Sequence, residues 1–325
     1  MAETDSSPPR PADDIPEPVP TPGVQASGLR RAFGAVKAVD GVTLTAPRGA
    51  ITALIGPNGS GKTTLLLILA GLLRPDDGTV DIIGHDLATD SARARARVGW
   101  MPDVFGTWDA LTCTEILVTF GRAYRMTIPA ARERAAELLA QVHLDEFATR
   151  PARVLSRGQK QRLGLARALV HDPDVLLLDE PASGLDPRSR IELRDMLRQL
   201  ARDGKTVVVS SHVLSELEEV YDHAVFLSQG RTVETPASPS GEAAATRGWR
   251  IASLDPVGLR TFLDGVGVPW QQGSWAGEAV VSLAGHESAV QLIRAAVHAG
   301  VPVHTVAPVS GRLEEAYLAL DEERI

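Results

Sequence analysis

A glycine-rich loop, set between an apolar run and a helical segment, constrains the fold of this chain more than any other feature. The loop follows the short β-like run 51–55 and precedes the apolar segment 64–72. A strand, a loop closed by lysine and threonine, and a helix follow one another as in a phosphate-binding loop. The alternative, a glycine-rich turn without a ligand, explains neither Lys62 nor Thr63. We therefore expect an α/β fold with a phosphate site at this turn.

The loop residues have separate expected roles. Glycines let backbone N–H groups turn inward around phosphate oxygens, and the start of the following helix adds its dipole. Lys62 supplies positive charge, and Thr63 offers a hydroxyl to Mg²⁺. The expected ATP-binding residues of this segment are Gly56, Pro57, Asn58, Gly59, Ser60, Gly61, Lys62, Thr63 and Thr64.

Two carboxylates, Asp179 and Glu180, directly follow the apolar run 175–178. Buried parallel strands read as such apolar runs, and ligands bind at their carboxyl ends. We expect Asp179 to hold Mg²⁺ through water, and Glu180 to orient or deprotonate an attacking water. Helix capping is the alternative role for this pair, and the phosphate loop argues against it.

The motif Leu155-Ser156-Arg157-Gly158-Gln159 closely resembles the Leu-Ser-Gly-Gly-Gln signature of ABC ATPases. Ser156 is also a good helix N-cap before the helical run 161–170, and the amides at the helix start would make an anion site. The resemblance implies a P-loop NTPase (RecA-like) core with an antiparallel β subdomain and a helical lobe at about 104–155. It also implies head-to-tail dimers, in which the signature residues Ser156, Arg157, Gly158 and Gln159 act in trans on the partner's ATP.

Other family elements appear in the expected order between Gly28 and Arg231. Phe33 is similar to the aromatic residue that stacks on adenine, and a core aromatic is the alternative. The run 183–186, ending in Asp186, resembles the D-loop. His212 resembles the switch histidine at the γ-phosphate, and a structural histidine at a strand end is the alternative.

The chain departs from the family pattern at Asp103 and Arg157. Asp103 stands where the family places a glutamine that contacts Mg²⁺ and the attacking water. Asp103 adds a third negative charge beside two carboxylates, which could raise a carboxylate pKa or slow hydrolysis. Asp103 is expected either to bind Mg²⁺ or to face the membrane partner, and the second role is favoured. Arg157 replaces a signature glycine, which is tolerable where φ is negative, so we expect function to be retained.

The segments suggest two folded units. Residues 1–24 form a proline-rich acidic tail that we expect to be disordered, 25–235 the ATPase domain, and 236–246 a linker. Residues 247–325 are expected to form a small accessory α+β domain. Its expected strands are 249–253, 280–283 and 301–306, and its expected helices are 256–263, 288–299 and 313–320. The closing run 312–318 resembles the end of bacterial ABC-2-type exporter ATPases.

Charge and hydropathy indicate the partners. A formal charge of −8 gives no general cationic surface, so we expect no nucleic-acid partner. The start of the sequence lacks the pattern of a secretory signal, and the longest apolar stretch is too short to cross a bilayer. We expect a cytoplasmic protein that reaches the cytoplasmic face of the membrane through membrane-spanning subunits, with a second ATPase subunit in a homo- or heterodimer.

Two other functions stay open at this point. One is an ABC ATPase acting on ribosomes or DNA. In the family, ribosome-acting members carry two ATPase units in one chain and DNA-maintenance members carry long heptad insertions between phosphate loop and signature, and this sequence has neither. The other is a regulatory nucleotide-binding module with little turnover, which is motivated by Asp103. The favoured hypothesis is an ATP-hydrolysing transporter subunit, with ATP and Mg²⁺ as its ligands.

Overall fold

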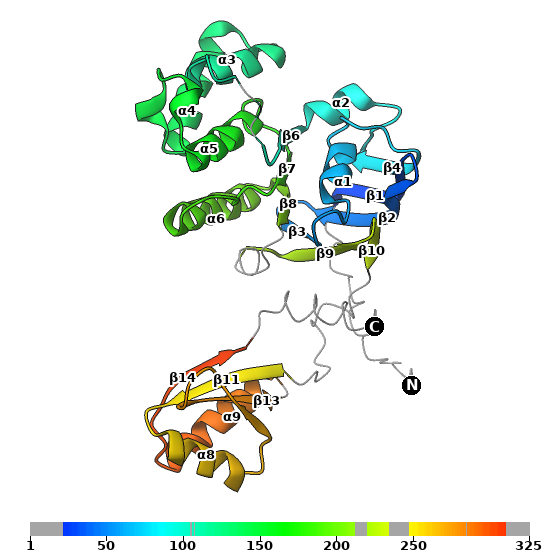
Figure 1. The fold of residues 1–325 in the computed structure, drawn as a ribbon. Helices are drawn as coiled ribbons and strands as arrows, with labels where there is room; N and C mark the ends of the chain where they lie inside the picture. The colour runs from blue at the N-terminus through cyan, green and yellow to red at the C-terminus, as the bar shows by residue number, and fades with distance from the viewer. Residues whose placement is uncertain are drawn as a thin grey trace, which may run out of the picture.

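In the computed structural model, the described residues are 22–104, 106, 108–211, 220–233, 247–283 and 285–309. They form an N-terminal unit with two sheets and a helical lobe, and a C-terminal unit with a sheet of its own (Figure 1). The expected linker 236–246, the expected last helix 313–320 and His212 lie outside these ranges.

A mainly parallel, six-stranded sheet forms the centre of the N-terminal unit. Its strand order is β10-β9-β3-β8-β7-β6, and only β10 runs antiparallel to its neighbour. The strands are β3 (Ile51–Ile55), β6 (Val98–Met101), β7 (Val175–Asp179), β8 (Thr206–Ser211), β9 (His223–Ser228) and β10 (Arg231–Val233). The apolar runs expected as buried parallel strands are thus confirmed.

An antiparallel sheet with the order β2-β1-β4-β5 lies beside it. Its strands are β1 (Pro22–Phe33), β2 (Val36–Pro47), β4 (Asp77–Ile82) and β5 (His85–Asp86). The expectation that residues 22–24 belong to a disordered tail was wrong. Val24 is fully buried and pairs with Ala46 and Ile82, because the alternation of buried and exposed positions in β1 begins there.

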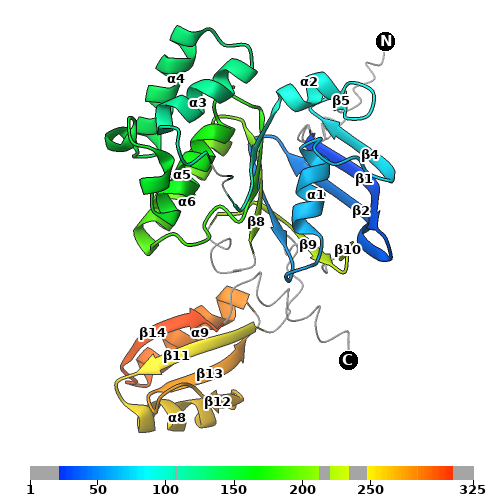
Figure 2. The same cartoon turned by 45° about the horizontal axis from the view of Figure 1, so that its top comes forward.

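Helix α1 (Lys62–Leu69) lies between the two sheets (Figure 2). Leu65, Leu66, Ile68 and Leu69 are all fully buried in one cluster that reaches both sheets. A helix covered on both sides needs apolar residues all round, which explains the unbroken apolar sequence after the loop. The short helix α2 (Ser91–Ala96) follows the antiparallel sheet.

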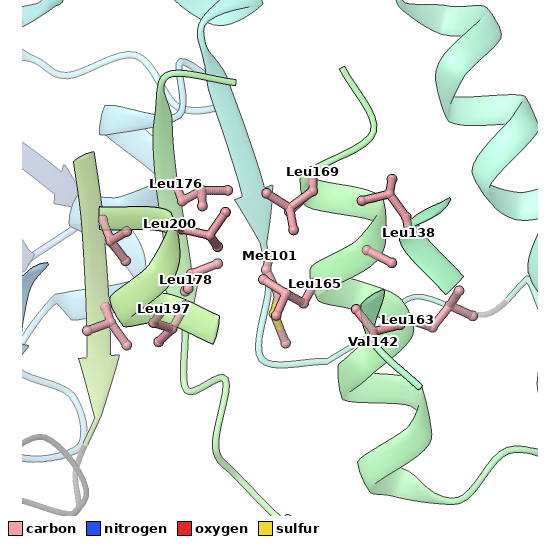
Figure 3. Close-up of a cluster of buried hydrophobic side chains, with 14 of the residues drawn as sticks. Met101, Leu138, Val142, Leu163, Leu165, Leu169, Leu176, Leu178, Leu197 and Leu200 are labelled. Carbon is pink, nitrogen blue, oxygen red and sulfur yellow. The ribbon is translucent and has the colours of Figure 1, made fainter. Parts of the chain in front are cut away.

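The helical lobe and α6 cover the other face of the parallel sheet. Its helices are α3 (Cys113–Ala123), α4 (Ile128–Gln141), α5 (Arg157–Ala168) and α6 (Pro187–Arg202), with 3₁₀ turns η1 (Asp145–Phe147) and η2 (Ala152–Val154). The lobe was expected to end near residue 155, but α5 also packs on α3 and α4. Figure 3 shows leucines of α4, α5, β7 and α6 meeting in one core cluster.

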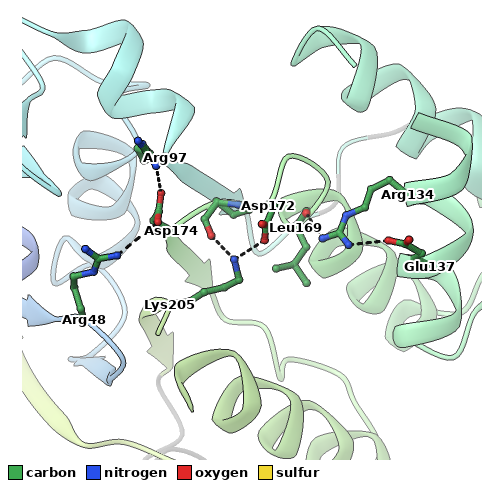
Figure 4. Close-up of polar contacts among 9 residues, drawn as sticks. Arg48, Arg97, Arg134, Glu137, Leu169, Asp172, Asp174 and Lys205 are labelled. Atoms are coloured by element: carbon green, nitrogen blue, oxygen red, sulfur yellow. Dashed lines mark hydrogen bonds and ion pairs between the residues drawn. The ribbon is translucent and has the colours of Figure 1, made fainter. Parts of the chain in front are cut away.

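Ion pairs tie the loops at the amino ends of the parallel strands, opposite the phosphate loop. Asp174, just before β7, lies 2.8 Å from Arg97 and 3.8 Å from Arg48 (Figure 4). Lys205, just before β8, donates to Asp172 at 2.6 Å. These contacts hold the strand starts together and leave the carboxyl ends free for a ligand.

The C-terminal unit has the element order β-α-β-β-α-β. Its elements are β11 (Arg247–Ser253), α8 (Pro256–Gly265), β12 (Trp270–Gln272), β13 (Glu278–Leu283), α9 (Gly285–His298) and β14 (Val303–Pro308). The sheet order β12-β13-β11-β14, with antiparallel neighbours, is that of a split βαβ fold. Trp249 is buried in the unit's own apolar cluster, as expected of a core aromatic.

None of the helices in the described part of the chain is both long and apolar enough to cross a membrane.

Candidate functional site

The phosphate loop is held by close backbone contacts at two of its glycines. A Cβ on Gly56 would lie 2.3 Å from the carbonyl oxygen of Leu227, and one on Gly61 would lie 2.2 Å from that of Ala38. Gly61 also has φ 102°, a left-handed conformation that favours glycine. The loop from Gly56 to Gly61 is therefore wedged between β2 and β9, with its shape fixed from behind.

Lys62 begins α1 and lies across the loop. Its Nζ donates to the carbonyl oxygens of Gly56 at 2.7 Å and Pro57 at 3.2 Å, and the residue is only 7% exposed. Burial lowers the pKa of Lys62, and the nearby carboxylates of Glu180 and Asp179 act in the opposite direction. The result is a buried cation at the point where a phosphate would meet the loop.

Asp179 connects the loop to the neighbouring strands. The Thr63 hydroxyl donates to Asp179 Oδ2 at 2.8 Å, and the Ser210 hydroxyl donates to Oδ1 at 2.6 Å. Asp179 and Ser210 are register partners on the parallel strands β7 and β8. The carboxylate is 2% exposed and its two oxygens are both hydrogen-bonded, so its orientation is fixed.

Glu180 follows at a sharp turn after β7. Its φ of 51° is unusual for a residue other than glycine, and its backbone N–H donates to Ser210 Oγ at 3.0 Å. Such a conformation is unfavourable by about 1 kcal/mol or more and persists where the surroundings fix it. The turn fixes the backbone of Glu180 directly after Asp179, and both carboxylates act on the charge of Lys62.

Phe33 lies at the end of β1 with half of its surface exposed. The guanidinium carbon of Arg31 lies 4.9 Å from the centre of its ring. The alternative of a core aromatic was wrong, because Phe33 presents a flat face to solvent.

The signature residues form the start of α5. Ser156 Oγ accepts from the Gln159 N–H at 3.2 Å, and Gln159 Oε1 accepts from the Ser156 N–H at 2.8 Å. This capping box satisfies two backbone donors and leaves the remaining amides of the first turn at the surface. Arg157 has helical backbone angles, as its tolerance requires, and its Nη2 donates to Ser183 Oγ at 2.7 Å. Gly158 follows in the same turn.

Asp186 caps the next helix, α6. Its carboxylate accepts from the Ser189 N–H at 3.0 Å and from the Ser189 hydroxyl at 2.6 Å. These hydrogen bonds, the one from the hydroxyl foremost, lower the pKa of Asp186. The residue expected in a D-loop therefore also has a structural role as an N-cap.

Asp103 is held by the signature helix. Gln161 of α5 donates through Nε2 to the backbone carbonyl of Asp103 at 2.9 Å. Asp103 Oδ1 is buried and has no hydrogen-bond partner among the described residues. Thr63, Asp179 and Ser210 hydrogen-bond to one another and to the Glu180 N–H, and Asp103 takes no part in these hydrogen bonds.

The structure thus brings the predicted residues together in two groups. The phosphate loop meets Asp179 and Glu180 at the carboxyl ends of the strands, and the signature meets the segment 183–186. The sequence analysis missed Ser210, whose hydroxyl donates to Asp179 Oδ1 and accepts from the Glu180 N–H. The available signal was a serine at the carboxyl end of an otherwise apolar parallel strand, beside the strand that ends in Asp179.

A groove of about 420 Å³ lies between the antiparallel sheet side and the helical lobe. Aromatic side chains from β6 and α3 line it, together with Arg95 from α2 and Arg167 from α5, and no carboxylate is among its lining residues. Val104 at its margin is 76% exposed and Leu72 is 60% exposed. The groove combines exposed apolar surface with positive charge.

Comparison with known proteins gives consistent relatives. A family model described as ABC transporter matches residues 39–183. The daunorubicin/doxorubicin resistance ATP-binding protein DrrA of Streptomyces peucetius is 37% identical over 235 residues, which are 72% of this chain and 71% of that protein. Nod factor export ATP-binding protein I of Ralstonia nicotianae is 38% identical over 213 residues, 66% of this chain and 66% of that protein.

Solved structures agree with these relatives. A dimeric ATP-binding cassette in a post-hydrolysis state, bound to ADP and Pi, aligns with a TM-score of 0.60 and 29% identity. The alignment covers 65% of this chain and 97% of that one. An ATP-binding subunit of an ABC transporter aligns with a TM-score of 0.59 and 28% identity, over 64% of this chain and 87% of that one.

Proposed function

The chain belongs to the ABC transporter family as an ATP-binding and ATP-hydrolysing subunit, and from this premise we propose a role for each part of its site. The names of its relatives concern export and drug resistance, which supports an exporter. In this proposal two ATP molecules close a head-to-tail pair of ATPase subunits, and hydrolysis reopens it. The pair drives separate membrane-spanning subunits from the cytoplasmic face of the membrane.

ATP binding is assigned to the phosphate loop and Phe33. The backbone N–H groups of residues 58–64 would surround the phosphates, and Lys62 would exchange its two carbonyl contacts for the β- and γ-phosphate oxygens. Its low exposure supports this role, because a desolvated ammonium gains most from an anionic partner. The exposed ring of Phe33 offers a surface on which adenine can stack.

Mg²⁺ fits the pair Thr63 and Asp179. Their oxygens lie 2.8 Å apart, and a hydroxyl with one carboxylate is the sparse, hard-oxygen donor set with which proteins hold Mg²⁺ beside phosphates. The ion would neutralise charge that develops on the phosphates. Ser210 would keep Asp179 in the required orientation through its hydrogen bond to Oδ1.

Glu180 is proposed as the catalytic base for the attacking water. The observation that carries this assignment is the fixed turn at Glu180, directly after Asp179, with left-handed backbone and its N–H anchored on Ser210. In this assignment Glu180 serves the water and Asp179 serves the metal. His212, after β8, is proposed to contact the γ-phosphate, as the family resemblance implies.

The signature half is proposed to act on the nucleotide of the partner subunit. The capping box at Ser156 and Gln159 leaves a helix start with surface amides, which suits a γ-phosphate that arrives with another subunit. Asp186 would lie close to the partner at the same interface, in the D-loop.

The groove beside α2 and α5 is proposed to receive a cytoplasmic helix of the membrane-spanning subunit. Its aromatic lining suits apolar side chains, and Arg95 with Arg167 suits an acidic residue on that helix. The Asp103 segment forms one wall, with Val104 and Gly106, and is linked to the signature helix by Gln161. Movement of the partner helix would thus be transmitted through Gln161 to the signature helix α5, which is proposed to contact the ATP of the other subunit.

The decisive experiment is ATPase activity of the purified chain with Mg²⁺, alone and with its membrane-spanning subunit in lipid. We expect Mg²⁺-dependent turnover that Lys62→Ala abolishes and that the partner stimulates. Arg95→Glu should remove the stimulation and leave basal turnover unchanged, whereas Arg132→Glu, on the exposed side of α4, should change neither. Tight ATP binding without turnover in either condition would instead identify a regulatory nucleotide-binding module.

A further inference from the structure

Arg157 is the position at which the signature of this chain differs from the family's glycine, and its side chain has a specific partner. The guanidinium Nη2 lies 2.7 Å from Ser183 Oγ. The stem and guanidinium lie over Gly184, since a Cβ placed there would be 2.6 Å from Arg157 Cδ and 2.7 Å from Nε. Ser183 and Gly184 open the D-loop, so Arg157 contacts the D-loop of its own subunit.

A second arginine of α5 holds the D-loop from its other end. Arg162 Nη2 donates to Ser189 Oγ at 2.7 Å and to Glu192 Oε2 at 2.7 Å. Ser189 in turn donates to Asp186, the last residue of the D-loop. The segment 183–186 is therefore fastened to α5 on both sides.

The arginine at position 157 has no role in the helix itself. A cation in the first turn opposes the helix dipole, and the capping box is complete without it. Without this side chain, contact between the signature turn and the D-loop would rest on the packing of Gly158 against Leu185. The contact with Ser183 thus adds a directional link that glycine does not provide.

We propose that Arg157 is a positioning residue, which fastens the D-loop to the signature helix so that both approach the partner's ATP as one rigid element. The inference rests on the proposed action of the signature in trans. Fastening lowers the entropy lost when two separate loops are ordered at the closing interface. Loss of the link should therefore weaken dimer closure and leave ATP binding to the phosphate loop of the same subunit intact.

The test uses the full chain with Glu180→Gln, in which ATP should trap the closed dimer. Sedimentation at increasing ATP concentration measures dimer formation, and a fluorescent ATP analogue measures binding to the monomer. We expect Arg157→Ala and Ser183→Ala each to raise the ATP concentration for half-maximal dimerisation by roughly three- to tenfold. The double substitution should cost no more than either single one, because both remove the same link.

Controls separate this role from others. Arg157→Lys should recover part of the loss, since lysine can donate to Ser183 but cannot cover Gly184 with a planar group. Arg153→Ala removes an exposed positive charge just before the signature and should leave dimerisation unchanged. Affinity of the monomer for the ATP analogue should stay within about twofold in every variant, which distinguishes positioning from general damage.

Three results would overturn the inference. If Arg157→Ala weakened dimerisation and Ser183→Ala did not, the guanidinium would act on the partner's nucleotide and not through the D-loop. If neither substitution changed dimerisation, the Arg157–Ser183 hydrogen bond would be a surface contact without a role in dimer closure. If the Glu180→Gln parent itself failed to dimerise with ATP, the proposed function and with it the premise of the inference would fall.

Discussion

The phosphate-loop half and the signature half of the site are built in opposite ways. In the first, Lys62 is 7% exposed, Asp179 2% and Ser210 fully buried; Lys62 donates to carbonyls of the loop, and Ser210 donates to Asp179. In the second, Ser156 and Arg157 are exposed, and Ser156 bonds mainly within its own helix turn. The phosphate-loop half is a buried hydrogen-bonded network, and the signature half is an exposed helix start.

The difference agrees with the proposal that one half binds its own subunit's ATP and the other binds the partner's ATP. Most buried polar groups are hydrogen-bonded within their own chain, and the contacts of Lys62 and Asp179 pre-organise the phosphate loop before nucleotide binds. An exposed helix start can stay hydrated until another surface covers it. A substitution in the first half should therefore affect stability and chemistry together, and one in the second should affect assembly alone.

The largest expected effect is on turnover at Glu180. Glu180→Gln keeps shape and hydrogen bonding but removes the proposed base, so turnover should fall about 10²- to 10⁴-fold with ATP affinity preserved. Steady-state ATPase assays and nucleotide-binding titrations measure both. Hydrolysis within a few-fold of the unmodified protein would show that Glu180 is not the base. The proposed assignment of Glu180 to the water and Asp179 to the metal would then be wrong.

Ser210→Ala tests whether the buried network is one unit. The change strips Asp179 Oδ1 of a donor and the Glu180 N–H of its acceptor, so we expect a loss of about 2–3 kcal/mol in unfolding free energy and at least tenfold in kcat. Thr52→Val in β3 is the matched control, because the buried Thr52 hydroxyl has no hydrogen-bond partner in the described structure. Denaturant unfolding that shows equal losses for both variants would contradict the network.

His171 tests the cost of burial away from the nucleotide. It stacks on Tyr124 with ring centres 3.6 Å apart, its Nε2 donates to the Val98 carbonyl at 3.0 Å, and burial lowers its pKa to about 4. Between that value and the ordinary 6.5, the unfolded chain takes up a proton that the folded chain does not. Stability should thus fall as pH drops below 6.5, and this contribution is absent above it.

His171→Phe keeps an aromatic ring against Tyr124 and removes the titration. After allowance for partial solvent exposure, we expect the loss of stability between about pH 7 and pH 5 to shrink by roughly 1 kcal/mol. His223→Gln, at an exposed strand start, serves as the control. Melting temperatures measured across this range would argue against a buried neutral imidazole if both variants followed the unmodified protein.

The smallest expected effect is at Asp103, which lies at the boundary of the two halves. Its carbonyl is held by Gln161 of the signature helix, and the proposed metal site is formed by Thr63 with Asp179. Asp103→Ala and Asp103→Asn should shift the Mg²⁺ requirement of the isolated subunit less than about twofold and reduce only partner-stimulated turnover. A clear shift in a Mg²⁺ titration of the isolated subunit would make Asp103 a metal ligand and move it into the first half.

The C-terminal unit shows which secondary-structure elements the local sequence pattern predicts and which it does not. The expected strands near 249–253 and 280–283 and the helices near 256–263 and 288–299 are present as β11, β13, α8 and α9. β12 was not expected, since Trp270–Gln272 is too short to show an alternating pattern. Its place at the sheet edge is set by pairing with β13, which joins residues of different segments.

The sequence by itself determined the elements whose chemistry is local. The phosphate loop, the apolar parallel strands and the capped start of α5 each follow from neighbouring residues, because turn conformation, strand burial and capping act over a few positions. Tertiary structure decided which distant groups meet: Ser210 with Asp179, Gln161 with the Asp103 carbonyl, and Arg157 with Ser183. Strand register and helix packing fix these contacts, and both depend on the whole core, which no short segment of sequence contains.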